Sequence, residues 1–143
     1  MKGAELALFE HQITVRWGDC DPAFIAYTGR IPNFALEAID AWWKHHMNLN
    51  WFELNVDRKL GTPFVHMSLD FTAPLTPRHV LICTVELLGL GTTSITYRVR
   101  GFQDGIQCFR GKFVSVFSTS SQVETRPPPE DLKALLTPLL VPE

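Results

Sequence analysis

The sequence predicts an α+β fold in which one long helix packs against a strongly curved antiparallel sheet. One strand pattern comes first, a helical stretch follows, and a run of strand patterns joined by short turns fills most of the remaining chain. The helical stretch is apolar nearly all round, which is typical of a helix covered by protein on several sides. With 45% hydrophobic and 20% charged residues, the 143-residue chain is expected to form one globular domain over residues 1–143.

The first strand is predicted over residues 12–17. Apolar and polar residues alternate there, so that Ile13, Val15 and Trp17 point the same way. Residues 18–22, with the sequence GDCDP, are rich in types that leave regular structure and predict a turn.

A long helix is predicted to begin near residues 30–33 and to end at about Met47. Pro32 suits the first helical turn, where a missing N–H leaves no hydrogen bond unmade. Residues at helical spacing form one apolar face, and three more apolar residues widen it beyond a normal stripe. The face comprises Ala35, Ala38, Ile39, Trp42 and His46, and Phe34, Leu36 and Trp43 widen it.

The second half of the chain predicts mainly strands. An irregular stretch that contains Trp51 and Phe52 comes first. Asp104-Gly105 is a strong hairpin signal between the last two strands. Three prolines at 127–129 break the last strand and lead into a short helix at 130–136. Alternation predicts strands over 62–71, 80–90, 92–102 and 106–118, of which the last three form an antiparallel meander.

Composition and charge exclude several classes of protein. The net charge of −2 argues against nucleic acid or an anionic membrane as the main partner. No apolar run approaches the roughly 18–20 residues of a membrane span, and the N-terminus makes a poor signal peptide. Cys20, Cys83 and Cys108 lie far apart and show no metal-ligand spacing, so neither a disulfide framework nor a metal site is expected. These features favour a cytoplasmic protein.

The nine residues 15–23, VRWGDCDPA, resemble the signature of the hot-dog-fold acyl-CoA thioesterases of the 4-hydroxybenzoyl-CoA thioesterase type. In that family an aspartate, followed by proline and a small residue, lies in the loop that enters the central helix. The resemblance extends over about residues 11–117, with 61–63 and 75–81 at positions comparable to family segments. It implies a hot-dog fold, in which the sheet wraps the long helix. It also implies homodimers joined sheet edge to edge, commonly paired into homotetramers, with active sites between subunits.

The resemblance further implies a hydrolase that converts an acyl-CoA to a free acid and coenzyme A, without a metal or another cofactor. It maps the catalytic carboxylate onto Asp21, as nucleophile or as general base towards water, and gives Asp19 an orienting role. The family's oxyanion donor, a backbone N–H seven residues further on, falls on Thr28. The first turn of a helix has free N–H groups that suit this task. From spacing alone, an aspartate-rich turn bonded to nearby backbone is the simpler interpretation.

Two departures from the family pattern bear on the substrate. Phe24 stands where glycine is usual, and its ring must either narrow the acyl site or turn out of it. Counting without a gap places Leu36 where the 4-hydroxybenzoyl enzyme has an aspartate that meets the phenol hydroxyl. We therefore expect an apolar pocket end and an aromatic, benzoyl-like acyl group, whereas Glu37 in that place would receive a polar substituent. Thr62 and His66 are further candidate substrate-binding residues.

Coenzyme A carries phosphates, which call for Arg or Lys near the mouth of the pocket. Other functions stay open beside hydrolysis of an aromatic acyl-CoA: a medium-chain or carrier-protein-linked acyl thioesterase, or a non-catalytic acyl-binding protein in which Phe24 blocks the site. The candidate phosphate ligands, each otherwise a solvated residue, are Arg78, Arg98, Arg100, Arg110 and Lys112.

Overall fold

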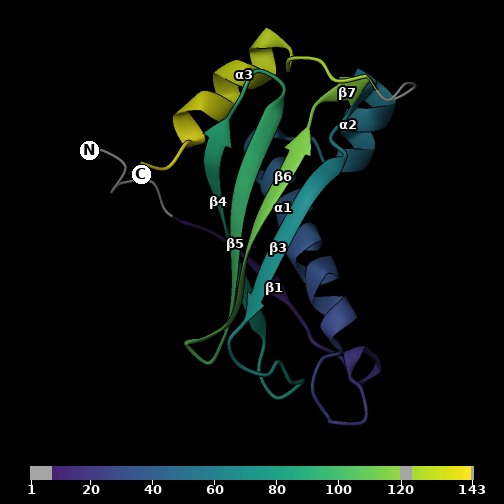
Figure 1. Cartoon of the computed structure of the whole chain (residues 1–143), viewed down its shortest axis with the longest axis vertical. Helices are drawn as coiled ribbons and strands as arrows, with labels where there is room; N and C mark the ends of the chain where they lie inside the picture. The colour runs from purple at the N-terminus through teal and green to yellow at the C-terminus, as the bar shows by residue number, and fades with distance from the viewer. Residues whose placement is uncertain (1–7, 120–123, 143) are drawn as a thin grey trace.

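A long helix lies along one face of a curved antiparallel sheet in the computed structural model, which describes residues 8–119 and 124–142 (Figure 1). The sheet has five strands in the order β1-β4-β5-β6-β3, and all neighbouring strands are antiparallel. This arrangement confirms the predicted α+β hot-dog architecture. The strands are β1 (Phe9–Ile13), β3 (Phe64–Phe71), β4 (Leu81–Leu90), β5 (Ser94–Gln103) and β6 (Ile106–Val116).

Shorter elements close the ends of this main unit. A two-stranded ladder pairs β2 with β7, and α3 packs at the end of the sheet near α2 (Figure 1). The helices and short strands are α1 (Ile31–Met47), α2 (Trp51–Arg58), α3 (Glu130–Leu136), β2 (Leu60–Gly61) and β7 (Ser118–Thr119), with 3₁₀ turns η2 (Trp17–Asp19), η3 (Thr28–Arg30) and η4 (Thr137–Leu139).

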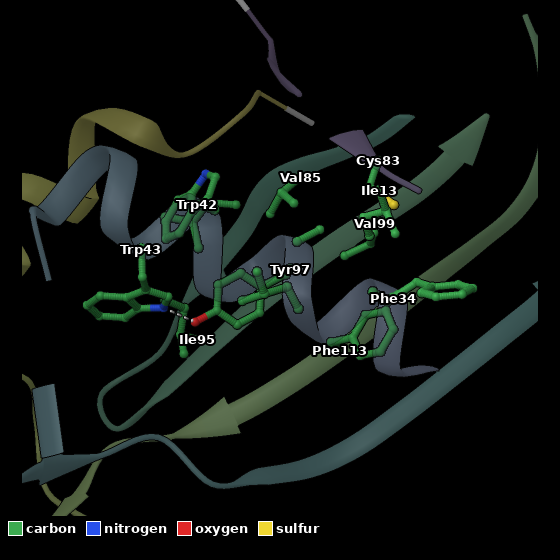
Figure 2. Close-up of a cluster of buried hydrophobic side chains, with 14 of the residues drawn as sticks. Ile13, Phe34, Trp42, Trp43, Cys83, Val85, Ile95, Tyr97, Val99 and Phe113 are labelled. Atoms are coloured by element: carbon green, nitrogen blue, oxygen red, sulfur yellow. Dashed lines mark hydrogen bonds between the residues drawn. The ribbon is translucent and has the colours of Figure 1, made fainter. Parts of the chain in front are cut away.

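The core forms where α1 meets the concave face of the sheet. Ala35 and Ala38 are fully buried, and their small side chains let the helix backbone approach the strands closely. Trp43 and Tyr97 are also fully buried, and the indole Nε1–H of Trp43 donates a 2.8 Å hydrogen bond to the Tyr97 hydroxyl (Figure 2). Burial in these surroundings raises the pKa of Tyr97 above its usual range, so the hydroxyl stays protonated.

The predicted meander is confirmed by the β4-β5-β6 ladder. Asp104 and Gly105 have φ values of 51° and 77°, which is the left-handed pair that a tight two-residue hairpin requires. The predicted helices over α1 and α3 are confirmed as well.

Two predictions of local structure are wrong. The first strand ends at Ile13 and not at Trp17, because a 3₁₀ turn begins at Trp17 and leaves that side chain 70% exposed. The stretch expected to be irregular after α1 is the helix α2. Its start is fixed by a capping box, in which Asn50 and Glu53 each accept a hydrogen bond from the other's backbone N–H.

The two edge strands of the sheet, β1 and β3, each pair on one side only among the described residues. β3 pairs with β6 on one side only, and most of its side chains are exposed, including Val65, Met67 and Phe71. An unpaired strand edge offers a row of free backbone groups to another strand.

Candidate active site

The loop between β1 and α1 is a narrow hairpin of its own. The Asp21 N–H donates to the Ile25 carbonyl at 3.0 Å, and the Tyr27 N–H donates to the Asp19 carbonyl at 2.8 Å. These two hydrogen bonds hold residues 19–27 in one conformation, so Asp21 has a defined position in a segment without regular secondary structure.

The tip of the hairpin explains the order of residues after Asp21. The Phe24 N–H donates to the Asp21 carbonyl at 2.9 Å, which closes a β-turn with Pro22 at the position that proline favours. The Ala23 N–H donates to Asp21 Oδ1 at 2.9 Å, as an aspartate opening a turn commonly arranges. Among the described residues nothing else bonds the Asp21 carboxylate. One carboxylate oxygen therefore shapes the turn, and the other is free.

Phe24 occupies the left-handed region with a φ of 66°, which gives a physical reason why glycine suits this position. Its ring is 68% exposed and stacks on Trp17, with ring centroids 6.1 Å apart and planes 23° from parallel. In a single copy of the chain the Phe24 ring therefore points toward solvent. Strand alternation predicted that Trp17 points the same way as Ile13 and Val15, but those two side chains are buried and Trp17 is exposed.

Thr28 stands at the entrance to the long helix. It is the first residue of η3, which runs directly into α1, so its N–H has no acceptor within the helix. No hydrogen bond from this N–H to any described residue is present either, and Thr28 is exposed. The Tyr27 ring lies over Gly29, where a Cβ atom would stand 2.6 Å from Tyr27 Cε2. A side chain at position 29 would therefore displace the Tyr27 ring from this place.

Asp19 ties the hairpin to the first helical turn. Its Oδ2 accepts the Arg16 N–H at 2.9 Å, and its Oδ1 lies 3.2 Å from Arg30 Nε. The Asp19 side chain is only 13% exposed, which strengthens both contacts relative to open solvent. The side chain therefore restrains the loop that carries Asp21 against the turn that carries Thr28.

The residues expected on the substrate side lie in three different places. Leu36 on α1 is half-buried and packs against the core, whereas Glu37 is exposed and lies 2.8 Å from His11 Nε2. Thr62 is buried between β2 and β3. His66 is exposed and faces away from α1, since it pairs with an outward residue of β6.

The chain by itself brings together only part of the predicted site. Asp21, Phe24 and Thr28 belong to one loop, but no hydrogen bond, ion pair or ring contact within the described residues joins that loop to Thr62 or His66. β3 starts beside α2, whereas the loop lies beside the start of α1 at the opposite end of the sheet (Figure 1).

Two further properties concern metals and membranes. Across residues 8–119 and 124–142, no three His, Cys, Asp or Glu side chains gather closely enough to hold a metal ion. None of the helices in those segments has the length and apolar character needed to cross a membrane.

Comparisons with known proteins give a consistent result. Residues 15–136 match the thioesterase-like superfamily. A thioesterase superfamily protein from Jannaschia sp. CCS1 is 50% identical, with a TM-score of 0.92 and 95% of each chain covered. A search of curated proteins found no match.

Two more distant structures share the fold. A 1,4-dihydroxy-2-naphthoyl-CoA thioesterase from Synechocystis is 19% identical, with a TM-score of 0.82 over 95% of this chain and 100% of that one. A gentisyl-coenzyme A thioesterase is 21% identical, with a TM-score of 0.79 over 87% of this chain and 99% of that one.

Proposed function

The chain belongs to the thioesterase-like superfamily, and from that premise we propose that it hydrolyses an aromatic, benzoyl-like acyl-CoA to the free acid and coenzyme A. One observation carries the proposal. A carboxylate with one free oxygen, on Asp21, and an N–H without an acceptor, on Thr28, belong to the same hydrogen-bonded loop. Thioester hydrolysis needs these two groups, an attacking or proton-accepting oxygen and a donor for the oxyanion.

Asp21 can serve the reaction in two ways. As a nucleophile, its free oxygen attacks the thioester carbonyl carbon, the C–S bond breaks, and water then hydrolyses the mixed anhydride. As a general base, it takes a proton from a water molecule that attacks the same carbon and expels the thiolate. In both routes the leaving thiolate takes up a proton to give free coenzyme A.

The helix entrance supplies the second requirement in either route. As the carbonyl carbon becomes tetrahedral, negative charge develops on its oxygen. The Thr28 N–H and the positive end of the helix dipole stabilise that charge. Because a backbone group does this work, the Thr28 side chain is not required.

We propose that two copies complete each site by pairing their β3 edges, with dimers paired again into tetramers. An antiparallel pairing of two β3 strands places the start of one beside the end of the other. β3 ends on the side of the sheet where α1 begins (Figure 1). Thr62 and His66 of the partner subunit would thereby approach the loop that carries Asp21.

The expected substrate follows from the helix residues beyond the loop. Leu36 offers an apolar end for an acyl pocket, and the Glu37 carboxylate is already beside His11. Two proteins of the same fold are named for aromatic acyl-CoA substrates, which favours an aromatic acyl group over a straight chain.

The cysteines of the chain are free, in keeping with work in the reducing cytoplasm.

The decisive experiment measures thiol release from benzoyl-CoA, hydroxybenzoyl-CoA and straight-chain acyl-CoAs. Asp21→Asn should lower the rate by about 10²–10⁴-fold, since the amide keeps the turn-forming oxygen but neither attacks nor takes a proton. Asp57→Asn, the same change at an exposed site on α2, should have wild-type activity. Circular dichroism verifies that both variants are folded.

The panel also separates the competing functions. Faster release from straight-chain or carrier-linked thioesters would assign the protein to that class. Binding of acyl-CoA by the wild type without thiol release would make it an acyl-binding protein. Full activity of Asp21→Asn would refute the mechanism.

A further inference from the structure

Four cations gather on the face of the sheet that turns away from α1. β5 contributes Arg98 and Arg100, which alternate with residues such as Tyr97 that are buried against the helix. β6 contributes Arg110 and Lys112. The register places Arg98 directly opposite Lys112 and Arg100 directly opposite Arg110. The four side chains therefore form two pairs that are neighbours on this face of the sheet, with the Val99–Gly111 pair between them along the ladder.

Two carboxylates flank these cations and neutralise them only in part. Glu86 Oε1 accepts a 2.8 Å hydrogen bond from Arg98 Nε, and Asp70 Oδ2 accepts one of 3.3 Å from Arg110 Nε. Both guanidinium groups thus bind through Nε, and their terminal nitrogens have no partner among the described residues. Lys112 likewise has no ion pair within residues 8–119 and 124–142. Against two carboxylates, four cations leave a local surplus of positive charge.

The same side chains line an open hollow of about 330 Å³, which we call the basic hollow. Ser68 and Asp70 of β3 line it on one side and Leu88 of β4 on another. The Arg100 Nη2 atom lies 3.9 Å from Glu86 Oε1, too far for a hydrogen bond, so this guanidinium also keeps donors available. A hollow with converging donors suits a compact anion better than it suits a flat macromolecular surface.

This arrangement destabilises the unliganded sheet. Like charges directly opposite each other on adjacent strands repel, and both pairs place two cations opposite each other. The chain as a whole carries a net charge of −2, so the local surplus runs against its overall balance. An anion held between the pairs would remove this repulsion and use the free guanidinium nitrogens at once.

We propose that the basic hollow binds a multiply charged phosphate anion, such as a diphosphate group. When the ligand is coenzyme A, the site rests on the proposed function and adds to it, because all four cations are among the candidate coenzyme A phosphate ligands; when the ligand is a free polyphosphate, the site goes beyond that function. Its ligand chemistry is shared by a free polyphosphate and by the phosphates of coenzyme A, and the two sources are distinguished by experiment.

The test uses inorganic diphosphate as the probe and thermal unfolding as the readout. Diphosphate should raise the Tm of the wild-type protein, and sodium chloride of equal ionic strength should raise it less. In Lys112→Gln the diphosphate affinity, measured by titration calorimetry, should fall about tenfold or more, because a charge-assisted contact is lost. Without anion, the same variant should be at least as stable as the wild type at low salt.

Lys133→Gln is the matched control, since it removes one exposed lysine charge on α3, and Lys133 is not among the residues that line the basic hollow. It should bind diphosphate like the wild type. An equal Tm gain in Lys112→Gln and the wild type, or none in either, would overturn the proposal. If the mass of the assembly in solution changes in Lys112→Gln and the wild type does not bind diphosphate, the face is a subunit contact and the proposal fails.

Parallel titrations with coenzyme A and dephospho-coenzyme A identify the source of the phosphate. Binding of coenzyme A that is lost in Lys112→Gln assigns the hollow to its phosphates, and a weaker response to dephospho-coenzyme A would place the 3′-phosphate there. Binding of diphosphate alone assigns it to a free polyphosphate. Both results support the anion site, and neither depends on thiol release, so an inactive protein would leave this test intact.

Discussion

Thr28→Pro removes one proposed catalytic group from the backbone while leaving the fold in place. Thr28 is the first residue of a helical turn, and proline is well tolerated at that position. Tyr27 before it has φ −61° and ψ 136°, an extended conformation that a following proline favours. The N–H that proline eliminates has no acceptor among the described residues, so no native hydrogen bond is broken.

We therefore expect a small gain in stability and a large loss in catalytic rate. Proline at a compatible site stabilises a protein by about 0.4–1 kcal/mol through the unfolded chain. For a chain of this length this corresponds to a Tm increase of about 1–3 °C. Loss of one oxyanion donor lowers kcat by about 10²–10³-fold, or about 2.7–4 kcal/mol of transition-state stabilisation.

Steady-state thiol release and differential scanning calorimetry on the same preparations test both effects. Thr28→Ala is the control, because it removes the side chain and keeps the N–H, and it should have at least half of the wild-type kcat. If Thr28→Pro folds with an unchanged Tm and still has full kcat, the oxyanion is stabilised elsewhere and the assignment of Thr28 is wrong.

Three further predictions concern the support of the site and the core. Asp19→Ala should destabilise the fold by about 2 kcal/mol and lower kcat about tenfold or more, because a backbone contact and an ion pair are lost. Asp19→Asn keeps an oxygen that accepts the Arg16 N–H, so it should recover part of the stability in denaturation assays and part of the kcat in kinetic assays. Equal values for Asp19→Asn and Asp19→Ala would contradict the role given to this acceptor. Gly101→Ala would bring a Cβ into collision with the buried Phe109 ring, so the Tm of this variant should fall by about 3–9 °C, whereas Gly18→Ala, with open space around it, should keep the wild-type Tm. Burial and the neighbouring His45 lower the pKa of His46, so this side chain takes up a proton more readily in the unfolded chain than in the native one. Stability should therefore fall as pH drops below about 6.5, and His46→Gln should flatten that slope in Tm measurements; an unchanged slope would exclude His46 as its source.

The fold was predictable because its main signals are local and redundant. Alternation marks β4, β5 and β6, the Asp104-Gly105 pair marks their last turn, and the apolar surface of α1 indicates a helix covered on several sides. The helix α2 was missed because Trp51 and Phe52 obscure its short amphipathic pattern. Its Asn50–Glu53 capping box was present in the sequence as a usable signal.

The sequence could predict only the part of the site whose residues lie close together along the chain. The motif indicated Asp21 and, by counting, Thr28, and the structure adds a reason for the motif by showing a turn built on Asp21 and Pro22. The conformation of Phe24 could not be foreseen, because a bulky residue disfavours positive φ and only the surrounding hydrogen bonds impose it. In the proposed dimer, Thr62 and His66 approach the loop from a second copy, and the pattern of one chain does not describe that arrangement.

The closed hairpin between β1 and α1 has a consequence for how the protein matures. Asp21 and Thr28 are seven residues apart, and the backbone hydrogen bonds within residues 19–27 join residues at most eight positions apart, although the Ala26 N–H also donates to the Leu75 carbonyl at 2.7 Å. Contacts between residues near in sequence form early in folding, whereas pairing of separate chains is slow and depends on concentration. In the proposed dimer, a newly made subunit would thus hold Asp21 and Thr28 in place before it pairs with a second copy. Dilution should then weaken substrate binding before it disturbs the loop itself.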